Sequence, residues 1–511
     1  MFLTDRRRLL QGASALLLLP AGRALAQPVR FTASPFTLGI ASGDPDPTSV
    51  VLWTRLAPDP QAADFGIPQV PVPVRWELSA DDDFRRILCT GEALAMPADA
   101  HSVHVVADGL APDSRYFYRF HAGEVTSPVG RTRTTPARGQ KVESLRYVYA
   151  ACQRFENGYY GAWRDAATSN PDLVLFLGDY IYENGRRPDL PRQHQDEMAV
   201  DLGSYRRRYG LYKADPDLQA AHAAAPWMAV WDDHEVVNNY KAERAPSMAD
   251  REAFLRRRAA GYKAWYEHMP VRPAMAPVGP DMKIYRAVEW GDLAKFQMVD
   301  ARQYGTWTDW PKGGEAVHIV DSDRRRDPAR SLLGADQERW LKSSLADSRA
   351  TWNVLAQQFV MAELKRPDEK TGAMGYGDDG WDAFPATRER VVEMLSQVSN
   401  PMVVGGDMHS FAASNLRLRP DGPVVAPAFV AGAISSPSPG GIARMQALSA
   451  LNPDFHYADN RVNGHSRVDV TRKEMLVTMR GVDDVTRQDS GSHDLARFVL
   501  EAGRPGAVRA S

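Results

Sequence analysis

The sequence predicts an α/β (α+β) sandwich domain preceded by a small all-β sandwich domain. Residues 27–138 contain short alternating runs of β-branched and aromatic residues separated by turns, a pattern typical of antiparallel strands. Residues 139–511 contain apolar runs without alternation, separated by helical segments, which favours strands buried on both faces. At roughly 150 residues per domain, a chain of 511 residues also favours more than one domain.

The strands of the first domain are predicted from alternation. They are Ser49–Thr54, Val72–Leu78, Ser102–Val106 and Tyr116–Phe120. Turns are expected at Gly43–Pro47 and Ala111–Asp113, and residues 134–139 are expected to form a linker. Short strands at this spacing indicate a sandwich of about 100 residues, similar to a fibronectin or immunoglobulin module. The region has no cluster of metal ligands or nucleophiles, so we assign it no chemistry.

Six apolar runs predict the strands of the second domain. They are Leu145–Ala151, Leu173–Leu177, Met228–Trp231, Phe296–Val299, Trp352–Leu355 and Met402–Val404. Helices are expected between these runs, including Asp250–Glu267, Gln337–Asp347 and Thr387–Gln397. Strands and helices in this alternation predict a layered α/β sheet domain.

The first 26 residues have the features of an export signal. A basic segment from Thr4 to Leu10 precedes an apolar stretch from Ala13 to Leu19, and Ala24–Ala26 forms a small-x-small cleavage site. The apolar stretch is too short to span a bilayer, so no stable membrane insertion is expected. The pair Arg6 and Arg7 resembles a twin-arginine signal, which predicts export of the folded protein by the twin-arginine machinery to the periplasm or the medium.

The overall composition excludes several functional classes. Hydrophobic residues make up 44% of the chain and charged residues 25%, as in ordinary soluble globular proteins. The formal net charge is −2, so nucleic-acid binding through bulk electrostatics is not expected. Removal of residues 1–26 takes away four arginines and one aspartate, which leaves a net charge of −5. The two cysteines cannot form a disulfide framework.

Polar residues follow each of the six apolar runs of the second domain. They are Cys152, Asp179, Asp232-Asp233-His234, Asp300-Ala301-Arg302, Gln357-Gln358 and Asp407-Met408-His409. Ligand sites of α/β sheets form beyond the carboxyl ends of the strands, so parallel neighbouring strands would bring these residues to one edge. A single aspartate after a strand often only caps a helix. Six strands that all end in this way favour a metal centre.

Three motifs give the chain a specific resemblance to a known family. They are Gly178-Asp179-Tyr180-Ile181-Tyr182-Glu183, Trp231-Asp232-Asp233-His234-Glu235 and Gly406-Asp407-Met408-His409. The ordered set resembles the PhoD-type alkaline phosphatases and phosphodiesterases, a branch of the calcineurin-like metallophosphoesterases. The resemblance extends to Ala41–Pro45, Val51–Arg55, Ala151–Gln153, Asp300–Tyr304 and Trp381–Pro385. It implies a metallophosphoesterase sandwich as the catalytic domain in residues 139–511.

The resemblance implies that the first metal is Fe³⁺. It would be held by Cys152, Asp179, Tyr182 and His409, and thiolate and phenolate ligands suit a highly charged transition ion. Alternatives stay open for three of these residues. Cys152 could be a small buried residue or a disulfide partner of Cys89, Tyr182 a core aromatic, and His409 a structural histidine. Cys89 is expected to be a buried core thiol.

The second implied metal is Ca²⁺. Asp179, Asp233 and Asp407 offer only oxygen ligands, which suit this hard cation. A further Ca²⁺ is implied too, with Asn238 as one candidate ligand and its interpretation as a simple loop amide as the alternative.

The implied reaction is hydrolysis of small phosphate monoesters and diesters at alkaline pH by a metal-activated hydroxide, without a covalent phospho-enzyme. By the resemblance, His234 would protonate the leaving oxygen or bind the phosphate. Arg302 would hold phosphate oxygens as a fork, and Arg154 is a weaker candidate for that contact. The alternatives are a hydrogen bond from His234 to Asp233 and a salt bridge from Arg302 to Asp300.

Two other functions stay open at this stage. The first is a phospholipase D-like phosphodiesterase, although the sequence has no obvious membrane-inserting amphipathic stretch. The second is a non-catalytic protein that binds metal or phosphate. His234 and Arg302 beside the metal ligands disfavour the second alternative, because a binding protein has no need of them.

Overall fold

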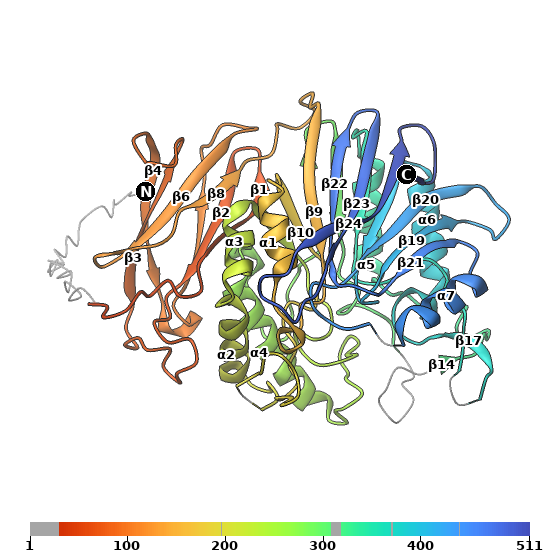
Figure 1. Cartoon of the computed structure of the whole chain (residues 1–511), viewed down its shortest axis with the longest axis horizontal. Coiled ribbons are helices and arrows are strands. Elements are labelled where there is room, and N and C mark those ends of the chain that lie inside the picture. The colour runs from red at the N-terminus through yellow and green to blue at the C-terminus, as the bar shows by residue number, and fades with distance from the viewer. Residues whose placement is uncertain (1–29, 196, 308–317, 369–370, 439, 511) are drawn as a thin grey trace, which may run out of the picture.

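The computed structural model describes residues 30–195, 197–307, 318–368, 371–438 and 440–510. The export signal predicted for residues 1–26 lies outside the described residues. Figure 1 shows the strands of two large sheets standing side by side in the middle of the molecule, with helices on the outer faces. Among the described residues, no helix combines the length and hydropathy needed to cross a membrane.

The first sheet has ten strands in the order β25-β24-β23-β22-β9-β10-β11-β1-β2-β5. They are β1 (Ile40–Asp46), β2 (Ser49–Arg55), β5 (Ser102–Ala107), β9 (Ser144–Ala150), β10 (Leu173–Phe176), β11 (Pro226–Ala229), β22 (Gly464–Thr471), β23 (Glu474–Val482), β24 (Ser492–Glu501) and β25 (Val508–Ala510). The central strands β9, β10 and β11 pair in parallel, and β1 pairs in parallel with β11. The first strands of the chain therefore continue the sheet that carries the predicted site.

The second sheet has seven strands in the order β12-β13-β15-β18-β20-β19-β21. They are β12 (Arg286–Trp290), β13 (Ala294–Met298), β15 (Trp352–Ala356), β18 (Pro401–Gly405), β19 (Phe411–Arg417), β20 (Val424–Ala431) and β21 (Phe455–Asp459). Strands β13, β15, β18 and β20 pair in parallel. The two sheets share one apolar core, in which the ring of Tyr147 on β9 meets the edge of Phe296 on β13 at 5.0 Å between centroids.

Two smaller sheets flank these layers. The N-terminal one has the order β4-β3-β6-β7, with β8 also paired to β6. Its strands are β3 (Val72–Ser79), β4 (Ile87–Ala95), β6 (Arg115–Ala122), β7 (Val125–Thr126) and β8 (Gly130–Arg133). It packs on β1, β2 and β5 through a separate core that includes Leu52, Val74 and Tyr118. The other small sheet joins β14 (His318–Ile319), β17 (Met374–Gly377) and β16 (Arg366–Pro367).

Helices cover the outer faces of the two large sheets (Figure 1). They are α1 (Gly161–Thr168), α2 (Leu202–Lys213), α3 (Pro216–Ala224), α4 (Arg251–His268), α5 (Ala335–Ala346), α6 (Pro385–Ser396) and α7 (Gly441–Leu451). Short 3₁₀ turns occur at η1 (Pro97–Asp99), η2 (Phe155–Asn157), η3 (Pro273–Met275) and η4 (Gly380–Ala383). Helices α1, α3 and α4 contact the first sheet, whereas α6 and α7 contact the second.

The predicted fold class is confirmed, with two differences in detail. The six apolar runs all form strands, but three lie in the first sheet and three in the second. The turn predicted at Gly43–Pro47 lies further along the chain, at Pro47–Thr48, because β1 continues to Asp46 through an irregularity between Gly43 and Asp46. Asp44 takes a left-handed φ of 42° there, which bends the strand without ending it.

Candidate metal centre

The predicted ligands lie just beyond the ends of parallel strands from both sheets. Cys152 follows β9, Asp179 follows β10, Asp233 follows β11, and Asp407 and His409 follow β18. Four of them have left-handed backbones, with φ of 59° at Cys152, Asp179 and Asp407 and 54° at His409. Side chains other than glycine rarely adopt this conformation, and such strained residues cluster at functional sites. The left-handed backbone conformations at this edge therefore favour a functional site there.

The four predicted Fe³⁺ ligands come together. One ligand atom each from Cys152, Asp179 and His409 all lie within 4.8 Å of one another. The hydroxyl of Tyr182 donates to Asp179 Oδ2 at 2.8 Å and lies 3.1 Å from His409 Nε2. His409 Nδ1 lies 2.9 Å from the carbonyl oxygen of Pro437, which turns Nε2 toward the other ligands.

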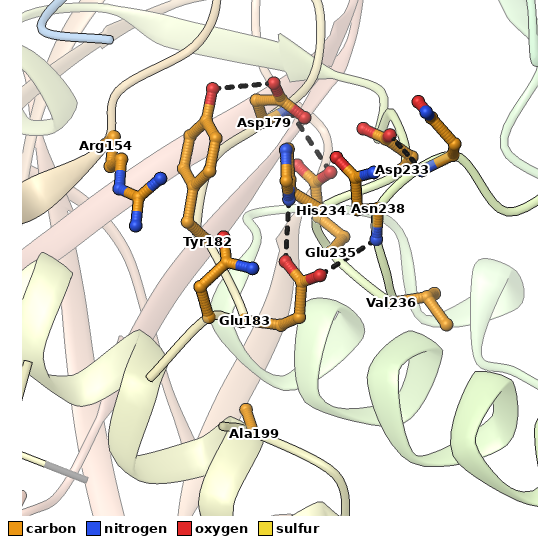
Figure 2. A network of polar contacts seen from close by, with 12 residues as sticks. Arg154, Asp179, Tyr182, Glu183, Ala199, Asp233, His234, Glu235, Val236 and Asn238 are labelled. Atoms are coloured by element: carbon orange, nitrogen blue, oxygen red, sulfur yellow. Dashed lines mark hydrogen bonds and ion pairs between the residues drawn. The ribbon is translucent and has the colours of Figure 1, made fainter. Parts of the chain in front are cut away.

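A second group combines Asp179 and Asp233 with His234, again within 4.8 Å of one another. The predicted Ca²⁺ set is therefore brought together in part, because Asp407 is outside this group and lines the cleft beside it. Figure 2 shows Asp179, Asp233 and the His234 ring converging.

Unsatisfied carboxylate oxygens at and next to the two groups indicate that the groups suit cations. Asp179 Oδ1, which belongs to both groups, and Asp232 Oδ2, in the residue beside Asp233, are buried and have no hydrogen-bond partner among the described residues. A buried polar atom left in this way costs about 1–3 kcal/mol, and more when it is charged. A cation beside these oxygens removes that cost. The donors of the first group include sulfur, phenol and imidazole, which suit a transition ion, whereas carboxylates predominate in the second.

The carboxyl groups and the thiol are crowded together, which changes their pKa values. Burial and the charge of Asp379 raise the pKa of Asp407 to about 7, and burial raises the pKa of Asp233 as well. Burial and the charge of Asp179 raise the pKa of the Cys152 thiol well above its usual range. Bound cations favour the deprotonated forms of all these groups and so reverse the shifts.

His234 forms a short pair with Glu183, a carboxylate that is 1% exposed. The distance from His234 Nδ1 to Glu183 Oε2 is 2.6 Å. Burial alone would lower the pKa of His234, but the charges of Glu183, Asp233 and Asp179 raise it well above its usual value. The ring also packs on Tyr182 at 4.1 Å between centroids. The pair with Glu183 therefore favours the imidazolium form of His234, and one ring nitrogen lies within 4.8 Å of ligand atoms of Asp179 and Asp233.

Arg302 is buried and carboxylates surround its guanidinium, although Nη2 has no hydrogen-bond partner among the described residues. Its Nε bonds to Asp232, its Nη1 lies 2.9 and 3.1 Å from the two oxygens of Asp379, and its Nη2 lies 3.7 Å from Asp233. Asp300 accepts the backbone N–H of Arg302 at 2.9 Å and is not its salt-bridge partner. This placement favours a role in which Arg302 fixes the carboxylates.

Glu235 and Glu183 lie inside the quoted motifs, but sequence reasoning gave them no role. Glu235 accepts the backbone N–H groups of Asp179 at 3.2 Å, Tyr180 at 2.7 Å and Asp232 at 2.9 Å, and thereby joins the two ligand loops. The signal available in the sequence was their position, because Glu183 directly follows Tyr182 and Glu235 directly follows His234. Asp379, which holds Arg302, follows β17, and no pattern in the sequence singled it out.

The remaining predicted residues fall in different places. Asn238 is exposed and offers Glu183 its backbone N–H at 2.8 Å, whereas the next residue, Asn239, lines the cleft. Arg154 is buried, bonds to Glu156 at 3.0 Å, and lies 5.4 Å from the centre of the Tyr182 ring.

Both cysteines are free thiols, so the disulfide alternative for Cys152 is wrong. Cys89 lies on the exposed strand β4 and is half-buried, where the sequence predicted a fully buried core thiol. Its place in the small N-terminal sheet, away from the ligand loops, gives it no part in the metal centre.

A cleft of about 310 Å³ lies beside the metal ligands. Asn239, Asp379, Asp407 and His409 form its polar side. The other residues that line it are Phe359, Val360, Leu364, Arg366, Gly377, Asp382, Met408, Ser438, Arg444, Met445 and Leu448. The cleft therefore leaves space for a small molecule next to Asp407 and His409.

The chain is similar to known phosphatases over most of its length. A family model described as PhoD-like phosphatase matches residues 147–479, and one described as its N-terminal domain matches residues 22–136. The chain is 41% identical to alkaline phosphatase D of Bacillus subtilis (strain 168) over 529 aligned positions, covering 99% of this chain and 89% of that protein. A solved structure of PhoD matches with a TM-score of 0.89 and 40% identity, covering 94% of this chain and 93% of that chain.

Proposed function

The chain belongs to the PhoD-like phosphatase family and is a phosphoric ester hydrolase, and on this basis we propose that it cleaves small phosphate monoesters and diesters with the help of Fe³⁺ and Ca²⁺. One observation carries the proposal. Cys152, Asp179 and His409 meet with Tyr182 in a buried site, directly beside Asp233 and His234.

The two ion types are assigned by their donors. Fe³⁺ would be held by Cys152, Asp179, Tyr182 and His409, and Ca²⁺ by Asp179, Asp233 and Asp407. Such cations neutralise charge on the phosphoryl oxygens and make a water nucleophile available near neutral pH.

Asn239 is a better candidate ligand for a further Ca²⁺ than Asn238. When the side-chain amide of Asn239 is oriented with its nitrogen toward Asp379 and Asp233, it donates to Asp379 Oδ2 at 3.2 Å and to Asp233 Oδ2 at 3.3 Å. In the opposite orientation its oxygen faces the two carboxylates. The three residues would then offer only oxygen ligands, which Ca²⁺ prefers.

His234 is the proposed general acid. Glu183 pairs with His234 Nδ1 and favours its charged form independently of the carboxylates that would hold the cations, and one ring nitrogen of His234 lies within 4.8 Å of ligand atoms of Asp179 and Asp233. An imidazolium in that position donates a proton to the leaving oxygen of the ester. Arg302 has the supporting role of holding Asp232 and Asp233 in place.

We also propose twin-arginine export to the periplasm or the medium, on the strength of residues 1–26 alone. Of the alternatives, the non-catalytic binding protein is disfavoured by the similarity to alkaline phosphatase D over almost the whole chain. A phospholipase D-like activity has no specific observation in its favour.

The test is turnover of an aryl phosphate ester by the purified mature chain, with metal analysis and a chelator control. We expect activity that the chelator abolishes, and a loss of more than about 100-fold in His234→Ala while the metal content stays the same. If His234→Ala loses metal and activity in equal proportion, His234 is a ligand and not the acid. Activity that survives complete removal of metal would overturn the metal-dependent mechanism.

A further inference from the structure

Ser436 makes a contact with the metal centre that no motif predicts. It follows strand β20, is fully buried, and donates its hydroxyl proton to Tyr182 Oη at 2.7 Å. The backbone N–H of Arg154 donates to the same Ser436 Oγ at 3.1 Å. Because Tyr182 donates its own hydroxyl proton to Asp179, the phenol oxygen is left to accept the proton of Ser436.

The backbone around Ser436 is tied to the loop that carries Cys152. The N–H of Ser436 donates to the carbonyl of Cys152 at 3.2 Å, and Asn463 Nδ2 donates to the carbonyl of Ser436 at 2.7 Å. Two residues earlier, Ile434 donates its N–H to Ala151 at 3.0 Å. Ser436 is therefore fixed relative to one candidate ligand while it bonds to another.

His234 and Arg154 lie next to the ring of Tyr182, whereas Ser436 contacts only its hydroxyl oxygen. His234 packs on one face at 4.1 Å, and the guanidinium of Arg154 lies 5.4 Å from the ring centre (Figure 2). The phenol oxygen also contacts Asp179 and His409 at 2.8 and 3.1 Å. The bond from Ser436 completes the contacts of that oxygen.

We propose that Ser436 is a positioning residue that fixes Tyr182 Oη among the candidate ligands and sets the strength of Tyr182 as a ligand. The inference rests on the proposed function only in that Tyr182 binds a cation. A hydrogen bond to an oxygen that carries charge is stronger than one to a neutral oxygen, so this bond favours the metal-bound phenolate. It also draws electron density from the oxygen, which raises the energy of phenolate-to-metal charge transfer.

The experiment compares Ser436→Ala with Ser435→Ala in the mature chain. Ser435 is a matched control, because it is equally buried but donates its hydroxyl to the carbonyl of Arg154 at 2.8 Å. Iron affinity is measured by competition with a chelator, and the visible spectrum is recorded. We expect Ser436→Ala to lose roughly tenfold in affinity and to move the charge-transfer band to longer wavelength. Ser435→Ala should change neither quantity by more than about twofold.

A double-mutant cycle with Tyr182→Phe separates this role from a general structural one. If Ser436 acts through the phenol oxygen, Ser436→Ala has no further effect on iron affinity in the Tyr182→Phe background. Ser436→Cys, which keeps the size and weakens the donor, should lose an intermediate amount if Ser436→Ala folds poorly. The proposal fails if Ser435→Ala loses as much as Ser436→Ala, or if the Ser436 effect persists without the phenol.

These outcomes are separable from failure of the proposed function. A wild-type chain that binds iron without a charge-transfer band would refute the assignment of Tyr182 as an iron ligand. The double-mutant cycle would then show no coupling between Ser436 and Tyr182 in iron affinity. That result would overturn the inference as well. A chain that shows the band and the coupling but no ester turnover would refute the enzyme and leave the role of Ser436 standing.

Discussion

At the scale of single residues, His234 owes both its orientation and its charge to Glu183. We predict that Glu183→Gln lowers kcat about 100-fold with little change in KM, because an amide supplies no negative charge to keep the imidazole protonated. Steady-state kinetics with metal analysis measures this. Glu197→Gln, at an exposed position of the following loop, is the matched control and should match the wild type. A kcat within threefold of wild type in Glu183→Gln would contradict the role.

Arg302 offers a second residue-scale prediction, since a lysine cannot reach three carboxylates at once. We expect Arg302→Lys to lower both metal content and stability, the latter by about 3 kcal/mol because buried carboxylates lose their partner. Chelator competition and thermal unfolding measure the two effects. Arg339→Lys, at an exposed pair with Asp336, should change neither. A raised KM with full metal content and unchanged stability would show instead that Arg302 binds the phosphate.

Residues of the site were predictable where they stood in contiguous motifs at strand ends. Cys152, Asp179 and His409 were found in this way, because a strand end fixes where its next few side chains point. Ser436 and Asp379 were not, since each reaches the site from a distant loop and acts through a contact that only the folded chain creates.

At the scale of elements, strand β1 reaches its neighbours only because Gly43 has no side chain. A Cβ at this position would lie 2.2 Å from the carbonyl oxygen of Pro270 and 2.6 Å from that of Trp227, and both are backbone atoms that cannot turn away. We predict that Gly43→Ala lowers the free energy of unfolding by about 3 kcal/mol. Denaturant unfolding measures the change.

The control for Gly43 is Gly203 near the start of α2. The nearest atom to a Cβ there is the flexible Arg207 Nη1 at 3.6 Å. Gly203→Ala should therefore raise the free energy of unfolding by about 0.5 kcal/mol, because alanine loses less backbone freedom in a helix. Equal destabilisation by both substitutions would mean that the close approach at Gly43 has no special weight.

Element types followed from periodicity, whereas the partners of the strands did not. Runs such as Leu173–Leu177 and Trp352–Leu355 are buried on both faces, so their residues carry no mark of which sheet they join. The strand character of Ile40–Asp46 was hidden by its glycine, aspartates and proline, which predict a turn when taken alone.

At the scale of the whole molecule, the N-terminal strands and the metal-bearing strands form one sheet. Strand β1 pairs with β11 at Ser42–Pro226 and Gly43–Trp227, and Trp53 donates to the carbonyl of Glu267 at 3.0 Å. We predict a single thermal transition for the full chain. A fragment of residues 139–511 should aggregate, because β11 would become an open edge. A soluble, active fragment with its own transition would show that the predicted boundary at 138 separates independent domains.

The metal centre also joins the two large sheets, so cations should stabilise the whole molecule in a pH-dependent way. Without metal, the pKa of Asp407 is raised to about 7 by burial and Asp379, and that of Glu235 to about 8 by burial and Asp179. Through these two groups the native state binds more protons than the unfolded state between about pH 4 and pH 8, so their contribution to the free energy of unfolding falls as the pH rises through that range. The lowered pKa values of Asp179 and of buried histidines such as His222 and His268 act in the opposite sense, but these histidines lie outside the metal centre, so their effect cancels when metal-bound and metal-free chains are compared.

A bound cation takes the place of those protons, so we predict that it raises Tm more at pH 8.5 than at pH 5, by about 3 °C. Thermal unfolding with metal and with chelator at both pH values measures this. Asp407→Asn removes one of the raised carboxyls, so the metal-free variant should lose less stability between pH 6 and pH 8 than the wild type does. If metal raised Tm equally at both pH values, the carboxylates would not be exchanging protons for cations, and the site would bind its ions through groups that are already charged.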